Sequence, residues 1–115
     1  MVLNQAVLIT GATGFVGRLL CKLLLARGVE VRGTLLPQES TSALVKGVVP
    51  TTFEPLEKPA IWTQALSGIE VVIHLAARVH IMHEYAVDPL NEFRIVNLVG
   101  TERLARQASA AGVRR

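Results

Sequence analysis

Apolar runs alternate with amphipathic segments along the whole chain, and this alternation predicts strands and helices in turn. Ala6–Thr10 and Val71–Leu75 are short and almost uninterrupted apolar runs. Such runs are typical of strands that are buried on both faces of a parallel sheet. Two less regular runs predict a second strand over residues 30–36 and a third strand over residues 48–53.

Helical signals fill the segments between these strands. Helices are expected over residues 14–27, 39–45, 59–66 and 88–111, and the last is bounded by Asp88 as its cap. The glycines expected to end helices in a left-handed conformation are Gly28, Gly68 and Gly112. The inward face of the last helix is expected to carry Phe93, Val96, Gly100, Leu104 and Ala108, at spacings of three and four.

Strands that alternate with helices are connected by right-handed crossovers, which makes the sheet parallel. The expected fold class is therefore α/β, with one Rossmann-type, doubly wound sheet of strand order 3-2-1-4 over residues 1–115. The chain ends at Arg115, so this sheet is expected to be truncated after its fourth strand and the following helix.

Three glycines follow the first strand at the spacing G-x-x-G-x-x-G. Gly11 permits a tight turn out of the strand, Gly14 permits close approach of a pyrophosphate, and Gly17 permits close packing of the following helix. The backbone N–H groups around Phe15 and Val16 then point at the phosphates, aided by the helix dipole. A strand before the motif and a helix after it favour a dinucleotide-binding site over a plain turn.

The sequence leaves the choice between NAD and NADP open. An acidic residue at the end of the second strand would bind ribose hydroxyls, and a basic residue would accept a 2′-phosphate. Leu35 and Leu36 occupy these positions, and Glu39 comes slightly later. Within the glycine loop, Thr13 is a further candidate for cofactor contact, and the alternative is that Thr10 and Thr13 bond to turn backbone.

Composition excludes several functional classes. The net charge is +3 but the basic residues are scattered, so no nucleic-acid surface is expected. Cys21 is a lone cysteine, which favours a reducing, cytoplasmic location. The apolar stretch Leu19–Leu25 is too short to cross a membrane. His80 and His83 lack a third ligand at convincing spacing, so no metal site is expected.

Three motifs together carry a family resemblance. Thr10–Gly17 reads TGATGFVG, Val72–Ala77 reads VIHLAA, and Val96–Thr101 reads VNLVGT. The triple resembles the N-terminal half of extended short-chain dehydrogenases/reductases, within the NAD-dependent epimerase/dehydratase family of UDP-glucose 4-epimerase-like proteins. His74–Met82 also resembles bacterial members that make or reduce UDP-linked deoxysugars. The resemblance implies a sugar-nucleotide substrate for the parent enzyme and hydride transfer at a sugar hydroxyl or ketone.

The resemblance also implies roles for individual residues. Leu75, Ala76 and Ala77 would line the ribose on the nicotinamide side, and Leu56 would pack on the adenine ring. Asn97 matches an asparagine that helps to order the site near the nicotinamide. Its place four residues after the inward Phe93 would independently put its amide among buried groups that need partners. His74, within the fourth strand, is expected to be buried and hydrogen-bonded.

The family's catalytic residues are not expected in this chain. They are a serine or threonine and a Tyr-x-x-x-Lys motif, whereas the residue four positions after Tyr85 is Pro89. The 115-residue chain is therefore expected to be unable to turn over, and a non-catalytic NAD(P)-binding sensor is the alternative. Without a fifth strand, the fourth strand would expose an apolar edge, which predicts a homo-oligomer.

Overall fold

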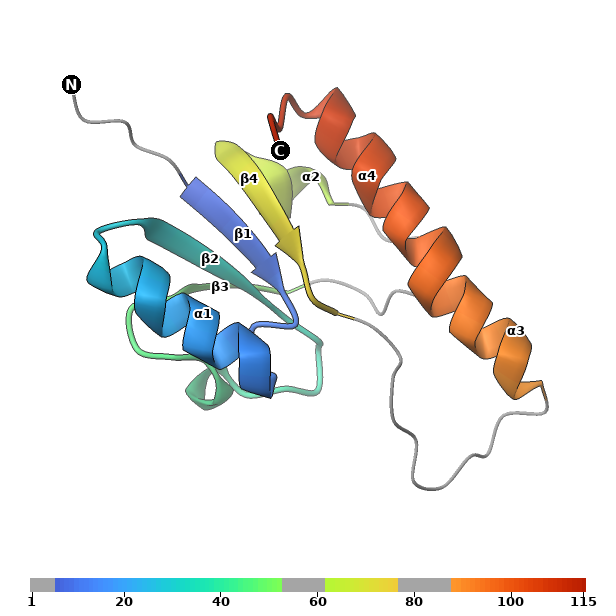
Figure 1. The fold of residues 1–115 in the computed structure, drawn as a ribbon, viewed down its shortest axis with the longest axis horizontal. Helices are drawn as coiled ribbons and strands as arrows, with labels where there is room; N and C mark the ends of the chain where they lie inside the picture. Colours follow the sequence, from blue (N-terminus) through green and yellow to red (C-terminus); the bar gives the residue numbers. More distant parts are fainter. Residues whose placement is uncertain (1–5, 53–61, 77–87) are drawn as a thin grey trace.

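The computed structural model describes residues 6–52, 62–76 and 88–115. In chain order the elements are β1 (Ala6–Thr10), α1 (Phe15–Ala26), β2 (Glu30–Leu35), the 3-10 turn η1 (Thr41–Ala43), β3 (Val49–Thr52), α2 (Thr63–Leu66), β4 (Ile69–His74), α3 (Pro89–Arg94), the π-helical turn η2 (Ile95–Val99) and α4 (Gly100–Ala110). Strands and helices alternate, as the hydrophobic pattern predicted (Figure 1).

The four strands form one parallel sheet in the order β3-β2-β1-β4, which confirms the predicted topology. β1 lies between two neighbours, and Val7 is paired with Val31 on one side and with Val71 on the other. All five residues of β1 are buried, because both edges and both faces of this strand are covered. The fold is therefore a Rossmann-type α/β sheet.

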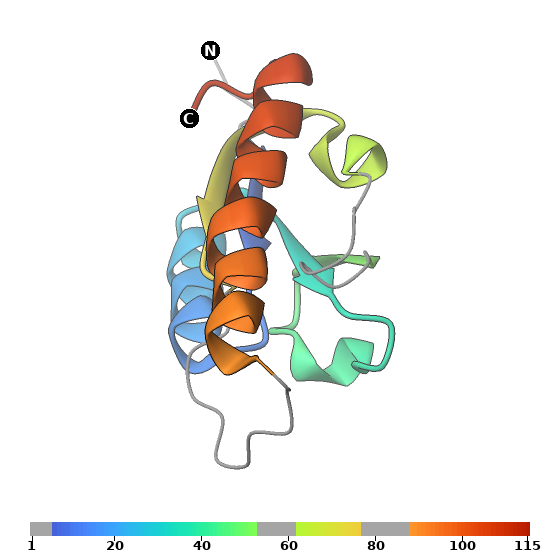
Figure 2. The ribbon, with the colours of Figure 1, turned by 90° about the vertical axis from the view of Figure 1, so that its right-hand side faces the viewer.

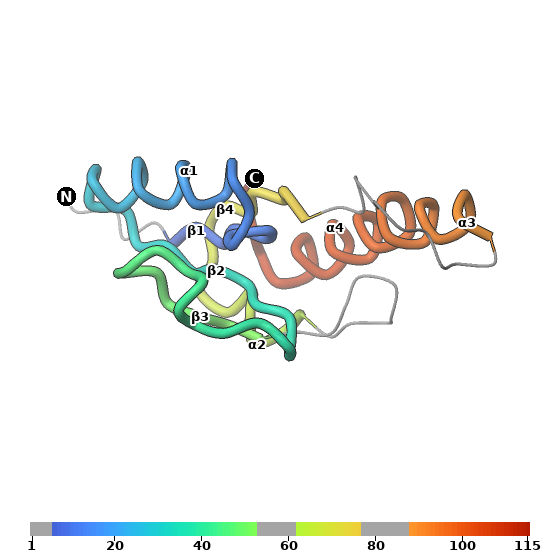
Figure 3. The backbone as a smooth tube through the Cα atoms, turned by 90° about the horizontal axis from the view of Figure 1, so that it is seen from below, coloured from blue at the N-terminus to red at the C-terminus, as the bar shows by residue number. Residues whose placement is uncertain are grey.

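Helices cover both faces of the sheet, with α1 on one side and α2 on the other (Figure 3). Successive β1 residues point to opposite faces. Ala6 and Leu8 join a core with residues of α2 and α4, whereas Val7 and Ile9 join a core with Cys21 of α1. The first core contains Ala6, Leu8, Trp62, Ala65, Leu66, Ile69, Val96, Leu104 and Ala108.

The segments α3, η2 and α4 form one uninterrupted helix (Figure 2). The Asp88 carboxylate accepts a hydrogen bond from the backbone N–H of Asn91 at 3.2 Å, and Pro89 occupies the first turn. Gly112 follows the helix with φ +87°. The predicted start and end of this helix are therefore confirmed, but the π-helical turn within it was not predicted.

Two further predictions need correction. The helix expected over residues 39–45 is only the 3-10 turn of η1. β4 was expected to be buried on both faces, yet it is half-buried from Glu70 to His74. Among the described residues, its edge away from β1 is paired with a short tail, in which the Arg114 N–H donates to the Glu70 carbonyl at 2.9 Å and the Val72 N–H donates to the Arg115 carbonyl at 2.7 Å.

The connections around β1 define where a ligand can approach the sheet. β1 leads through α1 to β2 on one side, whereas β4 pairs with β1 on the other side. Doubly wound sheets bind ligands at the carboxyl ends of the strands where the strand order reverses. Here that place is the ends of β1 and β4, where Thr10 is paired with His74.

Candidate functional site

The glycine loop lies between the end of β1 and the start of α1. Gly11 has φ +71°, a conformation that strains other residues. A Cβ atom there would lie 2.9 Å from the backbone nitrogen of Ala76, and a Cβ atom at Gly17 would lie 2.1 Å from the carbonyl oxygen of Gly11. The conformation of Gly11 agrees with its predicted role in the turn, whereas Gly17 packs on the loop itself and not, as was predicted, on the sheet.

The N-terminus of α1 faces outward. Gly14 caps the helix in an extended conformation without a side-chain cap, and its own N–H donates to the Gly11 carbonyl at 3.1 Å. The side chains of Phe15 and Val16 are 84% and 60% exposed. Since the first-turn N–H groups of a helix have no acceptor within the helix, this end can receive an anionic group.

The end of β4 is held directly against the glycine loop. The Thr10 hydroxyl oxygen accepts hydrogen bonds from the backbone N–H groups of Leu75 and Ala76 at 3.0 and 3.1 Å. Thr10 was expected to bond to backbone of its own turn, and its partners instead lie 65 and 66 residues further along the chain. Leu75 is exposed and Ala76 is half-buried, so these two residues form an accessible wall beside the glycine loop.

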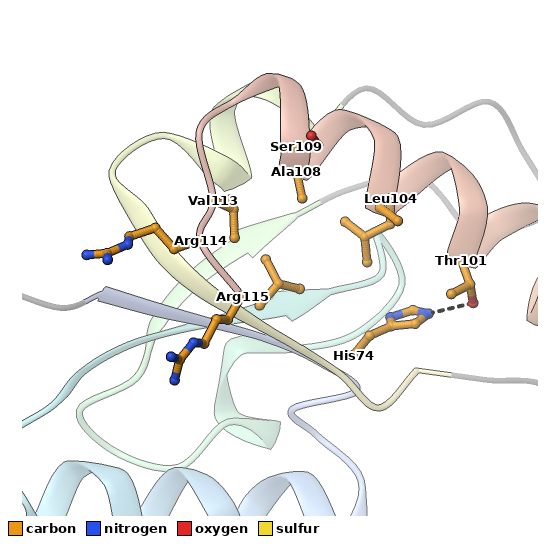
Figure 4. Close-up of a pocket in the computed structure, with 10 residues that line it drawn as sticks. His74, Thr101, Leu104, Ala108, Ser109, Val113, Arg114 and Arg115 are labelled. Carbon is orange, nitrogen blue, oxygen red and sulfur yellow. Dashed lines mark hydrogen bonds between the residues drawn. The ribbon is translucent and has the colours of Figure 1, made fainter.

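His74 connects this wall to the long helix. The Thr10 hydroxyl lies 2.6 Å from His74 Nδ1, and His74 Nε2 lies 3.1 Å from the Thr101 hydroxyl, as Figure 4 shows for the second contact. The Thr101 hydroxyl donates to the Asn97 carbonyl at 2.9 Å. His74 is half-buried rather than fully buried, and its predicted hydrogen bonding is confirmed.

Counting lone pairs shows which group donates in each hydrogen bond between Thr10, His74 and Thr101. A hydroxyl group has one hydrogen and two lone pairs, and both lone pairs of Thr10 are used by Leu75 and Ala76. Thr10 therefore donates to Nδ1, so the hydrogen of neutral His74 is on Nε2 and points to Thr101. Burial disfavours the charged ring and lowers the pKa of His74 below its ordinary value of 6.5.

Thr13 and Glu39 connect the glycine loop to the segment after β2. The Thr13 hydroxyl donates to Glu39 Oε2 at 2.7 Å, and the backbone N–H of Leu36 donates to Glu39 Oε1 at 2.9 Å. The alternative role of Thr13, a bond from its hydroxyl to turn backbone, is therefore not what the structure shows. Sequence reasoning did not assign Glu39 to the site, because the residue follows the end of the strand and reaches back to it.

Asn97 does not lie on the buried stripe of the long helix, as was predicted, because the residue is exposed. Val96, Gly100, Leu104 and Ala108 form that stripe. Asn97 lies within the π-helical turn Ile95–Val99. A π turn does not keep the 3.6-residue period of an α-helix, so the direction of a side chain within it does not follow from helical spacing. The backbone carbonyl of Asn97 still accepts a hydrogen bond from the Thr101 hydroxyl, which is in turn hydrogen-bonded to His74.

Several predicted residues lie outside the described part of the chain. These are Leu56 and Ala77 of the expected cofactor site, Pro59 at the expected start of the third helix, His80 and His83 of the rejected metal pair, and Tyr85. Among residues 6–52, 62–76 and 88–115, no group of three His, Cys, Asp or Glu side chains could hold a metal ion. No helix in these ranges is long and apolar enough to span a bilayer.

A cavity of about 290 Å³ lies between β4, α4 and the tail, and most of its wall is apolar (Figure 4). Its lining includes Val72, His74, Thr101, Leu104 and Arg115, and it includes no residue of the glycine loop. The cavity therefore lies apart from the glycine loop, and His74 at the end of β4 is part of its lining.

Comparisons with known proteins agree with this geometry. A 39% identical relative, sterol demethylase protein B of Methylococcus capsulatus, matches 94% of this chain and 32% of its own length. UDP-glucose 4-epimerase of Vibrio cholerae is 33% identical over 96% of this chain and 33% of its own length. A short-chain dehydrogenase/reductase superfamily structure from Agrobacterium tumefaciens with bound NAD is 33% identical, with a TM-score of 0.68 over 95% of this chain and 30% of that one. The chain thus spans about a third of the length of these relatives.

A parallel sheet of order β3-β2-β1-β4, with a glycine loop leading into an open helix N-terminus, defines the class of Rossmann-type dinucleotide-binding domains. The model of one family within this class, the NAD dependent epimerase/dehydratase family, matches residues 7–115. The chain belongs to that family.

Proposed function

We propose that this chain is the NAD(P)-binding part of a sugar-nucleotide epimerase/dehydratase of the UDP-glucose 4-epimerase type. The observation that carries the proposal is the open N-terminus of α1, which begins at Gly14 beside the Gly11 turn and the wall formed by Leu75 and Ala76. This arrangement offers backbone N–H groups to a pyrophosphate and leaves space for a ribose next to them. Family membership supports the same cofactor class.

The proposed contacts follow the predicted residues. The pyrophosphate would be held by the glycine loop and the first turn of α1, at Gly11, Thr13, Gly14, Phe15, Val16 and Gly17. Leu75, Ala76 and Ala77 would line the ribose next to the nicotinamide, and Leu56 would pack on the adenine. Asn97 would help to order the nicotinamide end.

The chemistry proposed for the parent protein is hydride transfer at a sugar carbon. When bound, the nicotinamide ring accepts a hydride from an alcohol carbon or returns it to a ketone. The residues of this chain bind and orient the dinucleotide, whereas the Tyr-x-x-x-Lys motif that moves the hydroxyl proton in this family is not in the sequence. The 115-residue chain is therefore proposed to bind NAD(P) without turning over substrate.

Titration calorimetry with NAD+ and NADP+ tests this proposal on the purified chain. Gly14→Val is expected to abolish binding, because it places a branched side chain where the phosphates approach, while the extended backbone at Gly14 accepts valine. Ala26→Val, at the exposed other end of α1, is the matched control and should bind like the unaltered chain. Failure of the unaltered chain to bind either dinucleotide would overturn the proposal.

Two alternatives are kept for the parent activity. The stretch His74–Met82 favours a UDP-deoxysugar 4-ketoreductase or dehydrogenase, and a non-catalytic NAD(P)-binding sensor is the second alternative. A cytoplasmic location is proposed from the single cysteine, Cys21, which is buried and free. Self-association is proposed through the edge of β4, of which the tail pairs only with Glu70 and Val72.

A further inference from the structure

Glu39 holds a carboxylate against the glycine loop. Its Oε2 accepts from the Thr13 hydroxyl at 2.7 Å, and its Oε1 accepts from the Leu36 N–H at 2.9 Å. The side chain is half-buried, so these two contacts fix its position while part of it stays accessible. Glu39 therefore lies at the carboxyl edge of the sheet, between the end of β2 and the loop that leads into α1.

The other acidic residues on the sheet lie at the amino ends of the strands, opposite the glycine loop. Glu30 is the first residue of β2, and Glu70 is the second residue of β4. Both lie at the amino ends of parallel strands, away from the glycine loop. Among the described sheet residues and the turn after β2, Glu39 thus brings a negative charge to the edge where a dinucleotide would lie.

The basic residues near this region are occupied elsewhere. A guanidinium nitrogen of Arg18 donates to the Ala43 carbonyl in η1. A guanidinium nitrogen of Arg32 donates to the carbonyls of Ala65 and Ser67, both at 2.8 Å. Both guanidinium groups are held against backbone carbonyls, and among the described residues neither forms an ion pair with Glu39.

We propose that Glu39 makes this site selective for NAD over NADP. The inference rests on the proposed function, because it assumes that a dinucleotide places its pyrophosphate on the N-terminus of α1. The adenosine ribose then lies near the end of β2, next to the glycine loop. Each carboxylate oxygen of Glu39 has a second lone pair for a ribose hydroxyl. The 2′-phosphate of NADP would instead meet a fixed like charge, which is unfavourable at short range.

Sequence spacing alone does not predict this selectivity for NAD. The end of β2 carries the apolar pair Leu35 and Leu36, which supplies neither an acid nor a base. The structure brings the acid from the next turn, because Glu39 folds back onto the Leu36 N–H. Thr13 is the second partner that fixes this position, so selectivity depends on a contact between two loops 26 residues apart.

Calorimetric dissociation constants for NAD+ and NADP+ test the inference, with the unaltered chain, Glu39→Gln and the control Glu30→Gln. The unaltered chain is expected to bind NAD+ about tenfold or more tightly than NADP+, as a like-charge contact implies. Glu39→Gln should narrow this ratio several-fold, mainly through tighter NADP+ binding. Glu30→Gln makes the same charge change at the opposite edge of the sheet and should leave the ratio unchanged.

The outcomes separate the two proposals. Equal or tighter binding of NADP+ by the unaltered chain overturns the role of Glu39 and leaves the proposed function intact, as does an unchanged ratio in Glu39→Gln. Binding of neither dinucleotide overturns the proposed function itself. If Glu39→Gln does not fold, the unaltered chain still decides the matter, because its preference for NAD+ must shrink as added salt screens the carboxylate.

Discussion

Thr10→Val tests the hydrogen-bond chain at the carboxyl edge of the sheet most directly. Thr10 is completely buried at the end of β1, and valine keeps its branched shape while removing the hydroxyl group. The hydroxyl oxygen accepts from the N–H groups of Leu75 and Ala76 and lies 2.6 Å from His74 Nδ1. The substitution therefore changes polar contacts with little change in packing volume.

The cost can be worked out group by group. The Leu75 N–H keeps a partner, because it also donates to the Thr10 carbonyl at 3.2 Å. The Ala76 N–H and His74 Nδ1 lose the partner that the structure gives them. A buried polar group without its hydrogen bond costs about 1–3 kcal/mol, and half-buried groups recover part of this from water. The expected loss in the free energy of unfolding is about 2–4 kcal/mol.

Urea unfolding followed by tryptophan fluorescence measures this loss, because Trp62 is the single tryptophan and is 1% exposed. The midpoint should fall in Thr10→Val without a change in slope. Thr10→Ser keeps the hydroxyl group and should stay within about 1 kcal/mol of the unaltered chain, the cost of a small buried deletion. A loss below about 0.5 kcal/mol in Thr10→Val, within the range of neutral substitutions, would refute the hydrogen-bond assignment.

Three further predictions follow from the same contacts. Burial lowers the pKa of His74 below 6.5, so the unfolded chain takes up this proton first. The stabilisation from neutral His74 is therefore fully present above pH 6.5 and is lost as the pH falls towards the pKa of the folded state. Urea unfolding at several pH values should show that His74→Gln removes this part of the dependence of unfolding free energy on pH. Leu104→Ala should cost about 2–5 kcal/mol in urea unfolding and Leu98→Ala under about 0.5, because Leu104 is 3% exposed and Leu98 is 65% exposed. Light scattering should show association that rises with concentration if the β4 edge pairs between copies, and a monomer at high concentration would contradict it.

The sequence was sufficient to predict the strand order because each local signal agreed with the others. The buried run at β1, the glycine turn and the cap at Asp88 each require only neighbouring residues, and the structure confirms all three. β4 itself was predicted correctly, but its expected burial on both faces was wrong, because burial of a strand depends on what lies beside it. Val71, Val72 and Ile73 are half-buried, and among the described residues the outer edge of β4 is paired with the tail at Arg114 and Arg115.

Part of the candidate site could also be predicted from the sequence, and part could not. The glycine loop could be predicted from spacing, since Gly11 needs a positive φ and Gly17 needs close packing. The exposure of Asn97 could not, because the residue lies in a π-helical turn that no residue type in Ile95–Val99 marks. Helical periodicity fixes a side chain's direction only while the turn length stays constant.

The contacts that complete the site depend on residues far apart in sequence. His74 meets Thr10 across 64 residues and Thr101 across 27, and Glu39 meets Thr13 across 26. In each case the sequence shows polar residues for which several partners are available. Only the fold selects among these partners, by bringing the ends of β1, β2 and β4 to one edge. The glycine motif therefore indicates the kind of ligand. The selectivity proposed for Glu39 and the hydrogen bonds of His74 depend instead on how the fold brings the carboxyl ends of the strands together.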